Sequence, residues 1–208
     1  MEIKTLKRFN REMSSFFALI ITNIVGAGLA MSYGVSTGVN SLILMINAQR
    51  ILLLQTVLSG LALLGFVFAI RWLIFSAQIF SDFDDLRDEF KNRSGKTDDE
   101  TMTELVIQNM AFYRDNKPAI EKLALGSRVT GIFFLILGAV AVFNLLTIGP
   151  TDLMSLLMGA SGAFLCVALG IVGAYSPSFF NKYSRIWAQR LQDSVEIENK
   201  LNALLEGN

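Results

Sequence analysis

The chain has 208 residues, of which 52% are hydrophobic and only 17% are charged, and its mean hydropathy is +0.48. A soluble domain with an ordinary water-facing surface does not carry this balance, which indicates a membrane protein in contact with the lipid bilayer. The formal net charge is zero and histidine is absent. These facts argue against a nucleic-acid partner and remove the commonest general base and metal ligand.

The N-terminal region predicts a helix on the membrane followed by a helix through it. Residues 1–13 carry basic and apolar side chains at helical spacing, which is typical of an amphipathic surface segment. The apolar run 14–33 is long enough to cross a hydrocarbon core of about 30 Å at about 1.5 Å per residue. A signal peptide is the alternative, but the run is long for one. Residues 34–41 are rich in Gly, Ser and Asn and predict a turn.

Two arginines mark the second apolar run, which extends from Leu42 to about Phe80. Arg50 and Arg71 lie about 31 Å apart along a helix, so they bracket a second span. Because Trp72 adjoins Arg71, we interpret Arg50, Arg71 and Trp72 as interface anchors. A gating or substrate charge is the alternative for Arg71.

The polar insert 82–128 continues the second helix into water, and Asn92-Arg93-Ser94-Gly95 ends that helix. Asp85, Asp88 and Glu89 share one helix face and form a candidate cation-attracting cluster. A solvated helix face is favoured, because basic residues lie nearby and no EF-hand spacing is present. In an oligomer, such carboxylates could also concentrate cations at a pore mouth.

The third and fourth spans are predicted as antiparallel neighbours, because only a short turn separates 129–147 from 153–175. Asn116-Lys117-Pro118 predicts a break or kink before the third span, and Ser176-Pro177 predicts the end of the fourth. The rest of the chain then forms an amphipathic helix.

The fourth span carries a stripe of small residues, which predicts close helix packing against this chain or another subunit. Its members are Gly159, Gly162, Cys166, Gly170 and Gly173.

Chemistry within the spans is restricted to neutral polar groups. Thr22 and Asn23 could line a polar path or bond helix to helix, and the second role is favoured. The spans show no carboxylate for proton coupling and no nucleophile paired with a base. We therefore expect neither an enzyme nor a cofactor or metal site.

Of 18 basic residues, Arg50 alone is predicted on the outer side. The positive-inside rule then places both termini and the insert in the cytoplasm, and we expect the plasma membrane of a prokaryote. The predicted fold is an all-α integral membrane protein with four transmembrane helices and a small cytoplasmic helical bundle. Its segments are 1–13 (amphipathic), 14–81 (spans one and two), 82–128 (cytoplasmic insert), 129–175 (spans three and four) and 176–208 (cytoplasmic amphipathic helix).

The leading functional hypothesis is a non-enzymatic, self-associating anchor or scaffold whose cytoplasmic helices bind a protein partner not identified by the sequence. The alternative is a subunit of an oligomeric ion or small-solute channel with a cytoplasmic helical vestibule. The predicted topology is similar to that of connexin-type large-pore channels, although the paired extracellular cysteines of connexins are absent.

Overall fold

The computed structural model describes residues 3–49, 53–93, 99–147 and 153–206. These residues form four long helices and, within those ranges, no strand. The all-α class is confirmed for these residues, and each helix contains a stretch that is long and apolar enough to cross a membrane, as four spans require. The helices are α1 (Ile3–Ala48), α2 (Leu53–Arg93), α3 (Asp99–Thr147) and α4 (Leu153–Glu206).

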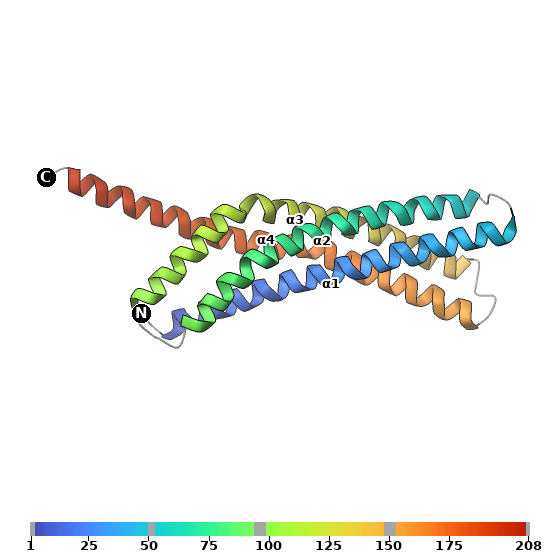
Figure 1. Cartoon of the computed structure of the whole chain (residues 1–208), viewed down its shortest axis with the longest axis horizontal. Coiled ribbons are helices and arrows are strands. Elements are labelled where there is room, and N and C mark those ends of the chain that lie inside the picture. The colour runs from blue at the N-terminus through green and yellow to red at the C-terminus, as the bar shows by residue number, and fades with distance from the viewer. Residues whose placement is uncertain (1–2, 50–52, 94–98, 148–152, 207–208) are drawn as a thin grey trace.

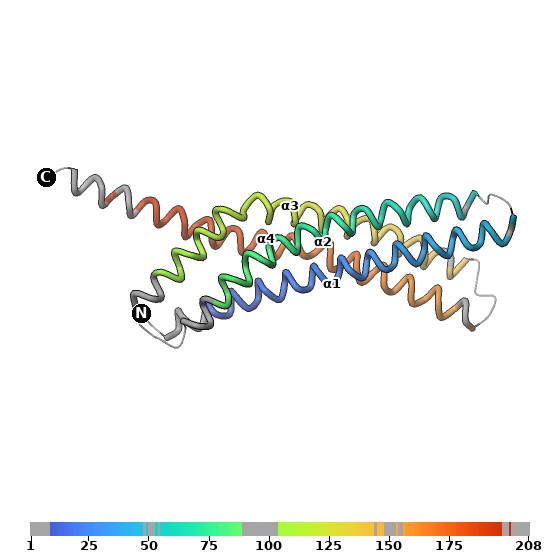
Figure 2. Tube along the Cα trace, in the orientation of Figure 1, coloured from blue at the N-terminus to red at the C-terminus, as the bar shows by residue number. Residues whose placement is uncertain are grey.

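The helices are arranged as two antiparallel hairpins that run along the long axis of the molecule (Figure 1; the Cα trace is in Figure 2). The first hairpin is formed by α1 and α2, and the second by α3 and α4. The hairpins pack together through contacts of α2 with α3 and of α1 with α4. The result is a four-helix bundle in which every helix has two neighbours.

The predicted turn at 34–41 is wrong, because α1 remains helical to Ala48. The chain leaves the helix at Gln49, whose φ of 48° lies in the left-handed region. Gly34 serves packing instead: a Cβ there would lie 3.1 Å from the carbonyl oxygen of Ala62 on α2. Small residues let helices approach closely in a membrane, and their composition resembles that of a turn. Arg50, the predicted outer anchor, lies outside the described residues.

Pro118 and Pro177, two of the three prolines, lie within continuous helices. Pro118 is inside α3, which stays helical and bends along its length (Figure 1). Pro177 is inside α4, so Ser176-Pro177 does not end that helix. A proline removes one backbone hydrogen bond, but contacts with neighbouring helices hold the rest of the helix in place. Predictions that α2 continues past Arg71 and ends near Arg93 are confirmed.

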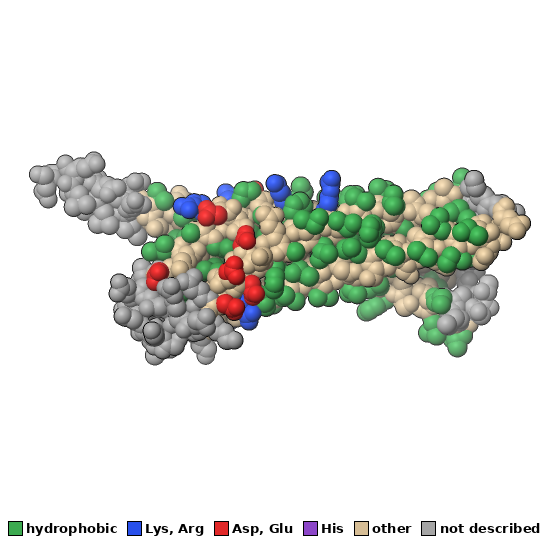
Figure 3. All heavy atoms as spheres, in the orientation of Figure 1, with side chains coloured by type: hydrophobic (Ala, Val, Ile, Leu, Met, Phe, Trp, Pro, Cys, Tyr) green, Lys and Arg blue, Asp and Glu red, His purple; other side chains and the backbone are tan. Residues whose placement is uncertain are grey.

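Among the described residues, charged side chains occupy only one end of the bundle. Arg71 of α2 and Arg128 of α3 are level, because the contacts Gly65 with Phe133 and Phe75 with Gly126 flank them on antiparallel helices. Beyond that level, toward the hairpin ends, the described chain carries no Asp, Glu, Lys or Arg. Figure 3 shows this half covered by hydrophobic side chains. We call residues 27–49, 53–70, 129–147 and 153–175 the apolar layer, and the described remainder the charged extension.

On α1 the charged extension includes apolar residues that the sequence predicts as the beginning of the first span. Phe16 packs against Phe83 of α2 with ring centroids 4.9 Å apart. The guanidinium of Arg87 lies 3.9 Å from the ring centroid of Phe17. The first part of the run 14–33 therefore lies beside the acidic stretch of α2.

Candidate functional site

Three helices meet at Asn23, which is fully buried on α1. The indole Nε1 of Trp72 on α2 donates to Asn23 Oδ1 at 2.9 Å. The hydroxyl of Ser176 on α4 donates to the same oxygen at 2.9 Å and lies 2.6 Å from Asn23 Nδ2. Asn23 Nδ2 also donates to the carbonyl of Leu19 at 2.7 Å. A buried amide with all these partners fixes the register of α1, α2 and α4 at the edge of the apolar layer.

The two neutral polar residues of α1 differ in the hydrogen bonds that they make. Asn23 bonds helix to helix, which is the role that its sequence context favours. Thr22 is exposed, and its hydroxyl donates to the carbonyl of Ala18 within α1 at 2.8 Å. Trp72 has no exposed surface, so it does not face a lipid boundary as an interface anchor would. Arg71 beside it is exposed at the same level.

An aromatic core fills the charged extension around Phe16. Its ring centroid lies 4.7 Å from that of Trp187 and 5.8 Å from that of Phe180, both on α4. Tyr113 of α3 completes the contact with Trp187 at 5.7 Å and bonds the Ser184 hydroxyl at 2.7 Å. Because all four helices contribute, the extension is a packed bundle and its helices are not independent arms.

An ion pair beside this core links α1 to α4. Arg190 Nη2 of α4 lies 2.8 Å from Glu12 Oε2 of α1, and their side chains are 32% and 12% exposed. A carboxylate so shielded needs its cation, because leaving it alone would cost much of its solvation. The pair therefore joins the N-terminal part of α1 to α4.

An acidic stripe lies on the outer face of α2. Asp82, Asp85 and Asp88 are exposed at spacings of three, so their side chains share one helix face. Arg87 lies over Phe17, and none of these three carboxylates has an ion-pair partner among the described residues. Figure 3 shows acidic side chains gathered at this end of the bundle.

The predicted cation cluster lies in this stripe. Asp85 and Asp88 are exposed, and the side chain of Glu89 lies outside the described residues. Where side chains are described, no group of three His, Cys, Asp or Glu is placed to hold a metal ion.

Exposed basic side chains lie on both helices of the second hairpin. Lys117 and Lys122 of α3 and Lys182 and Arg185 of α4 are all exposed. Their level is set by two contacts between helices: Phe83 with Phe112, at 5.4 Å, and Tyr113 with Ser184. Arg185 therefore lies level with Phe83 inside the acidic stripe, and Lys117 lies about one helical turn nearer the apolar layer than Asp82.

The small-residue stripe of α4 packs against α3 of the same chain. A Cβ at Gly173 would lie 2.7 Å from Gly131 Cα, and one at Gly170 would lie 2.8 Å from the backbone nitrogen of Leu135. Gly159 faces Leu145, whereas Gly162 faces Tyr33 of α1. Cys166 is fully buried, and its Cβ lies 3.3 Å from the position a Cβ would take at Gly138. The partner that the sequence left open is thus mainly α3.

Sequence reasoning missed the residues that complete these contacts. Gly131 and Gly138 of α3 are seven residues apart and therefore share a face, a signal that was present in the sequence. Ser176 was interpreted as part of a helix end, so its role as a partner of Asn23 was not expected.

The fold and these contacts define an all-α protein with four long apolar helices, each able to span a membrane, that continue into a charged helical bundle. No family model matches the chain, and no match was found among curated proteins or solved structures.

Proposed function

We propose that the protein is a non-enzymatic membrane scaffold that self-associates through its charged extension. The observation that carries this proposal is the pair of opposite surfaces on that extension. The acidic stripe is exposed on α2, and the basic residues Lys117 and Arg185 are exposed on the second hairpin within about one helical turn of that depth. The packed aromatic core holds both surfaces rigidly relative to the apolar layer.

Orientation in the membrane follows from the charges that border the apolar layer. Moving out of that layer, the first charged residues on α2, α3 and α4 are Arg71, Arg128 and Lys182, all of them exposed. Basic residues at one border favour the cytoplasmic side. The charged extension is then a cytoplasmic helical bundle with both termini inside, and we assign the protein to a prokaryotic plasma membrane.

The similar depth matters because neighbouring membrane proteins lie in one plane. Two copies can pair the stripe of one with Lys117 and Arg185 of the other with a displacement of at most about one helical turn along the membrane normal. Such a head-to-tail contact uses two different surfaces and generates a ring or an open chain of subunits. Each exposed ion pair contributes little and is weakened by salt, so the contact needs several pairs and the crowding of the membrane.

Charge reversal tests the proposal. The variants D82K/D85K/D88K and K117E/R185E should each reduce wild-type oligomers to monomers in nanodiscs, as counted by single-molecule photobleaching. Combining all five substitutions in one chain should restore association, because the two surfaces are again opposite. Asp193→Lys is the control, since Asp193 is exposed on α4 about two helical turns beyond Arg185. A monomeric wild type, or a five-substitution variant that stays monomeric, would reject self-association through these surfaces.

A scaffold also binds a cytoplasmic partner. We expect this partner to bind the acidic stripe or the exposed basic residues of the second hairpin. The partner would be a protein with complementary charge. Crosslinking from a photoreactive residue at position 85 would identify it, provided that the crosslink is lost in D82K/D88K.

The second candidate is a subunit of an oligomeric channel for ions or small solutes. It is favoured by polar residues on α1 within the apolar layer, among them Ser36 and Asn40, which are exposed there. Flux of ions and small dyes through vesicles that contain confirmed oligomers tests this candidate. Absence of flux under those conditions rejects it and leaves the scaffold intact.

A further inference from the structure

An open cleft of about 700 Å³ lies between α1 and α4 inside the apolar layer. Small and apolar residues of α4 form one wall, including Met158 and Gly162. The opposite wall is polar and repeats at helical spacing along α1. Its members are Ser32, Tyr33, Ser36, Thr37 and Asn40.

The hydrogen bonds of this cleft are incomplete. The hydroxyl of Ser32 donates to the carbonyl of Gly28 at 3.0 Å, and the hydroxyl of Ser161 donates to the carbonyl of Met158 at 3.1 Å. Ser36 and Asn40 have no hydrogen-bond partner among the described residues. An amide carries two donor hydrogens and an acceptor oxygen, and leaving them unpaired in hydrocarbon is costly. The cleft therefore calls for a partner that offers both donors and acceptors.

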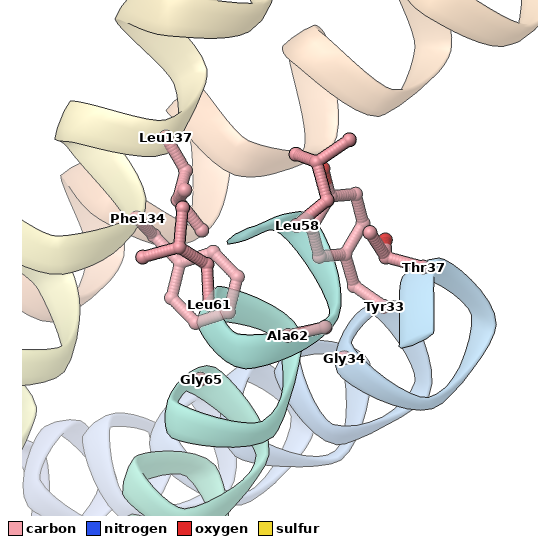
Figure 4. Close-up of a pocket in the computed structure, with 9 residues that line it drawn as sticks. All are labelled: Tyr33, Gly34, Thr37, Leu58, Leu61, Ala62, Gly65, Phe134 and Leu137. Atoms are coloured by element: carbon pink, nitrogen blue, oxygen red, sulfur yellow. The ribbon is translucent and has the colours of Figure 1, made fainter. Parts of the chain in front are cut away.

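A second, smaller cavity of about 30 Å³ lies behind the polar wall. Tyr33 and Thr37 line both spaces, so they separate the cleft from this cavity. Its other walls come from α2 and α3, as Figure 4 shows, and its volume is enough for about one water molecule. The residues drawn there from these two helices are Leu58, Leu61, Ala62, Gly65, Phe134 and Leu137.

We propose that this cleft binds an uncharged polyol group, either as a free polyol or as the glycerol moiety of a neutral lipid. Hydroxyls and an amide match the mixed donors and acceptors of a polyol. The lining contains no charged side chain, and the surrounding apolar layer disfavours a charged ligand. The volume lies within the usual range for small-molecule sites. This inference does not rest on self-association.

Access to the cleft can be measured with a thiol reporter. In a Cys166→Ala background, which removes the buried native thiol, Ser36→Cys places a reporter in the cleft. Val39→Cys is the matched control, because Val39 lies one turn away and lines an apolar groove between α1 and α2. Thiols react as thiolates, which form only where water reaches. The S36C chain should react with a neutral methanethiosulfonate about tenfold faster than with charged ones, since the apolar layer penalises charge.

The V39C chain should react slowly with the neutral and the charged reagents alike. If S36C behaves like V39C, the cleft is closed to polar molecules and the proposal is wrong. If S36C reacts equally fast with neutral and charged reagents, the assignment of an uncharged ligand is wrong.

Protection of S36C identifies the ligand and its source. Glycerol in the buffer should slow the labelling if the cleft takes free polyols, and diacylglycerol in the vesicles should slow it if the cleft takes lipid. Adding Asn40→Leu should abolish protection, whereas adding Val39→Leu should leave it intact. If neither ligand protects, or if protection survives Asn40→Leu, the polyol site is rejected. The oligomeric state of S36C should equal that of wild type, so failure here is distinct from failure of self-association.

Discussion

The indole nitrogen of Trp72 lies 2.9 Å from the amide oxygen of Asn23, and both side chains are fully buried at the edge of the apolar layer. Ser176 shares that oxygen from a third helix. A single amide thus joins three helices where the apolar layer meets the charged extension.

Removing that amide should destabilise the bundle. Asn23→Ala leaves the N–H of Trp72 and the hydroxyl of Ser176 buried without this partner. We expect a loss of about 1–3 kcal/mol in the free energy of unfolding, measured by titration with a denaturing detergent in mixed micelles. Thr22→Ala is the control, because the Thr22 hydroxyl bonds only within α1 and is exposed. Equal effects of the two substitutions would contradict a special role for Asn23.

Adding a methyl group within the α3–α4 contact should force the two helices apart. A Cβ at Gly173 would lie 2.7 Å from backbone atoms of α3, which cannot rotate away as a flexible side chain could. Gly173→Ala should therefore cost about 1–3 kcal/mol or more in the free energy of unfolding. In contrast, nothing lies within 4 Å of a Cβ at Gly28. Gly28→Ala should be neutral or stabilising by up to about 1 kcal/mol, because alanine is the better helix former.

The aromatic core should depend on Phe16 more than on any lipid-facing ring. Phe16 is fully buried and contacts rings from α2 and α4. Phe16→Ala should cost about 3–5 kcal/mol in the free energy of unfolding. Phe164 is 76% exposed in the apolar layer, so Phe164→Ala should cost far less. Loss of tryptophan fluorescence anisotropy would report loosening around Trp72 and Trp187 together, and similar losses in both variants would contradict a packed extension.

The Glu12 and Arg190 pair should show measurable coupling. In a double-mutant cycle of Glu12→Gln and Arg190→Met, we expect a coupling energy of about 1 kcal/mol that falls as salt is added. The control pair is Glu196 and Lys200, whose side chains are 64% and 71% exposed. Their coupling should stay below about 0.5 kcal/mol. A coupling that is equal in both pairs would show that shielding of Glu12 has no energetic consequence.

The charge pattern and the hydropathy were sufficient to predict four apolar helices and the continuation of α2 into the charged extension. The apolar helices and the continuation of α2 both follow from local composition, because composition determines whether a stretch is stable in lipid or in water. Local composition also misled. Gly34 and its neighbours were predicted to form a turn, because glycine and serine are common both in turns and in tightly packed membrane helices. Trp72 was interpreted as an interface anchor, because it adjoins Arg71 in the sequence.

Which residues meet across the bundle was decided only by the tertiary structure. Asn23 and Ser176 are separated by 153 positions, and no local pattern specifies that they share hydrogen bonds. The polar wall of the cleft likewise depends on α1 staying helical through Asn40 and on the gap that α4 leaves beside it. The sequence by itself determined the class of protein, because burial of apolar surface depends on composition. The structure determined its contacts, because hydrogen bonds and close packing depend on distances between helices.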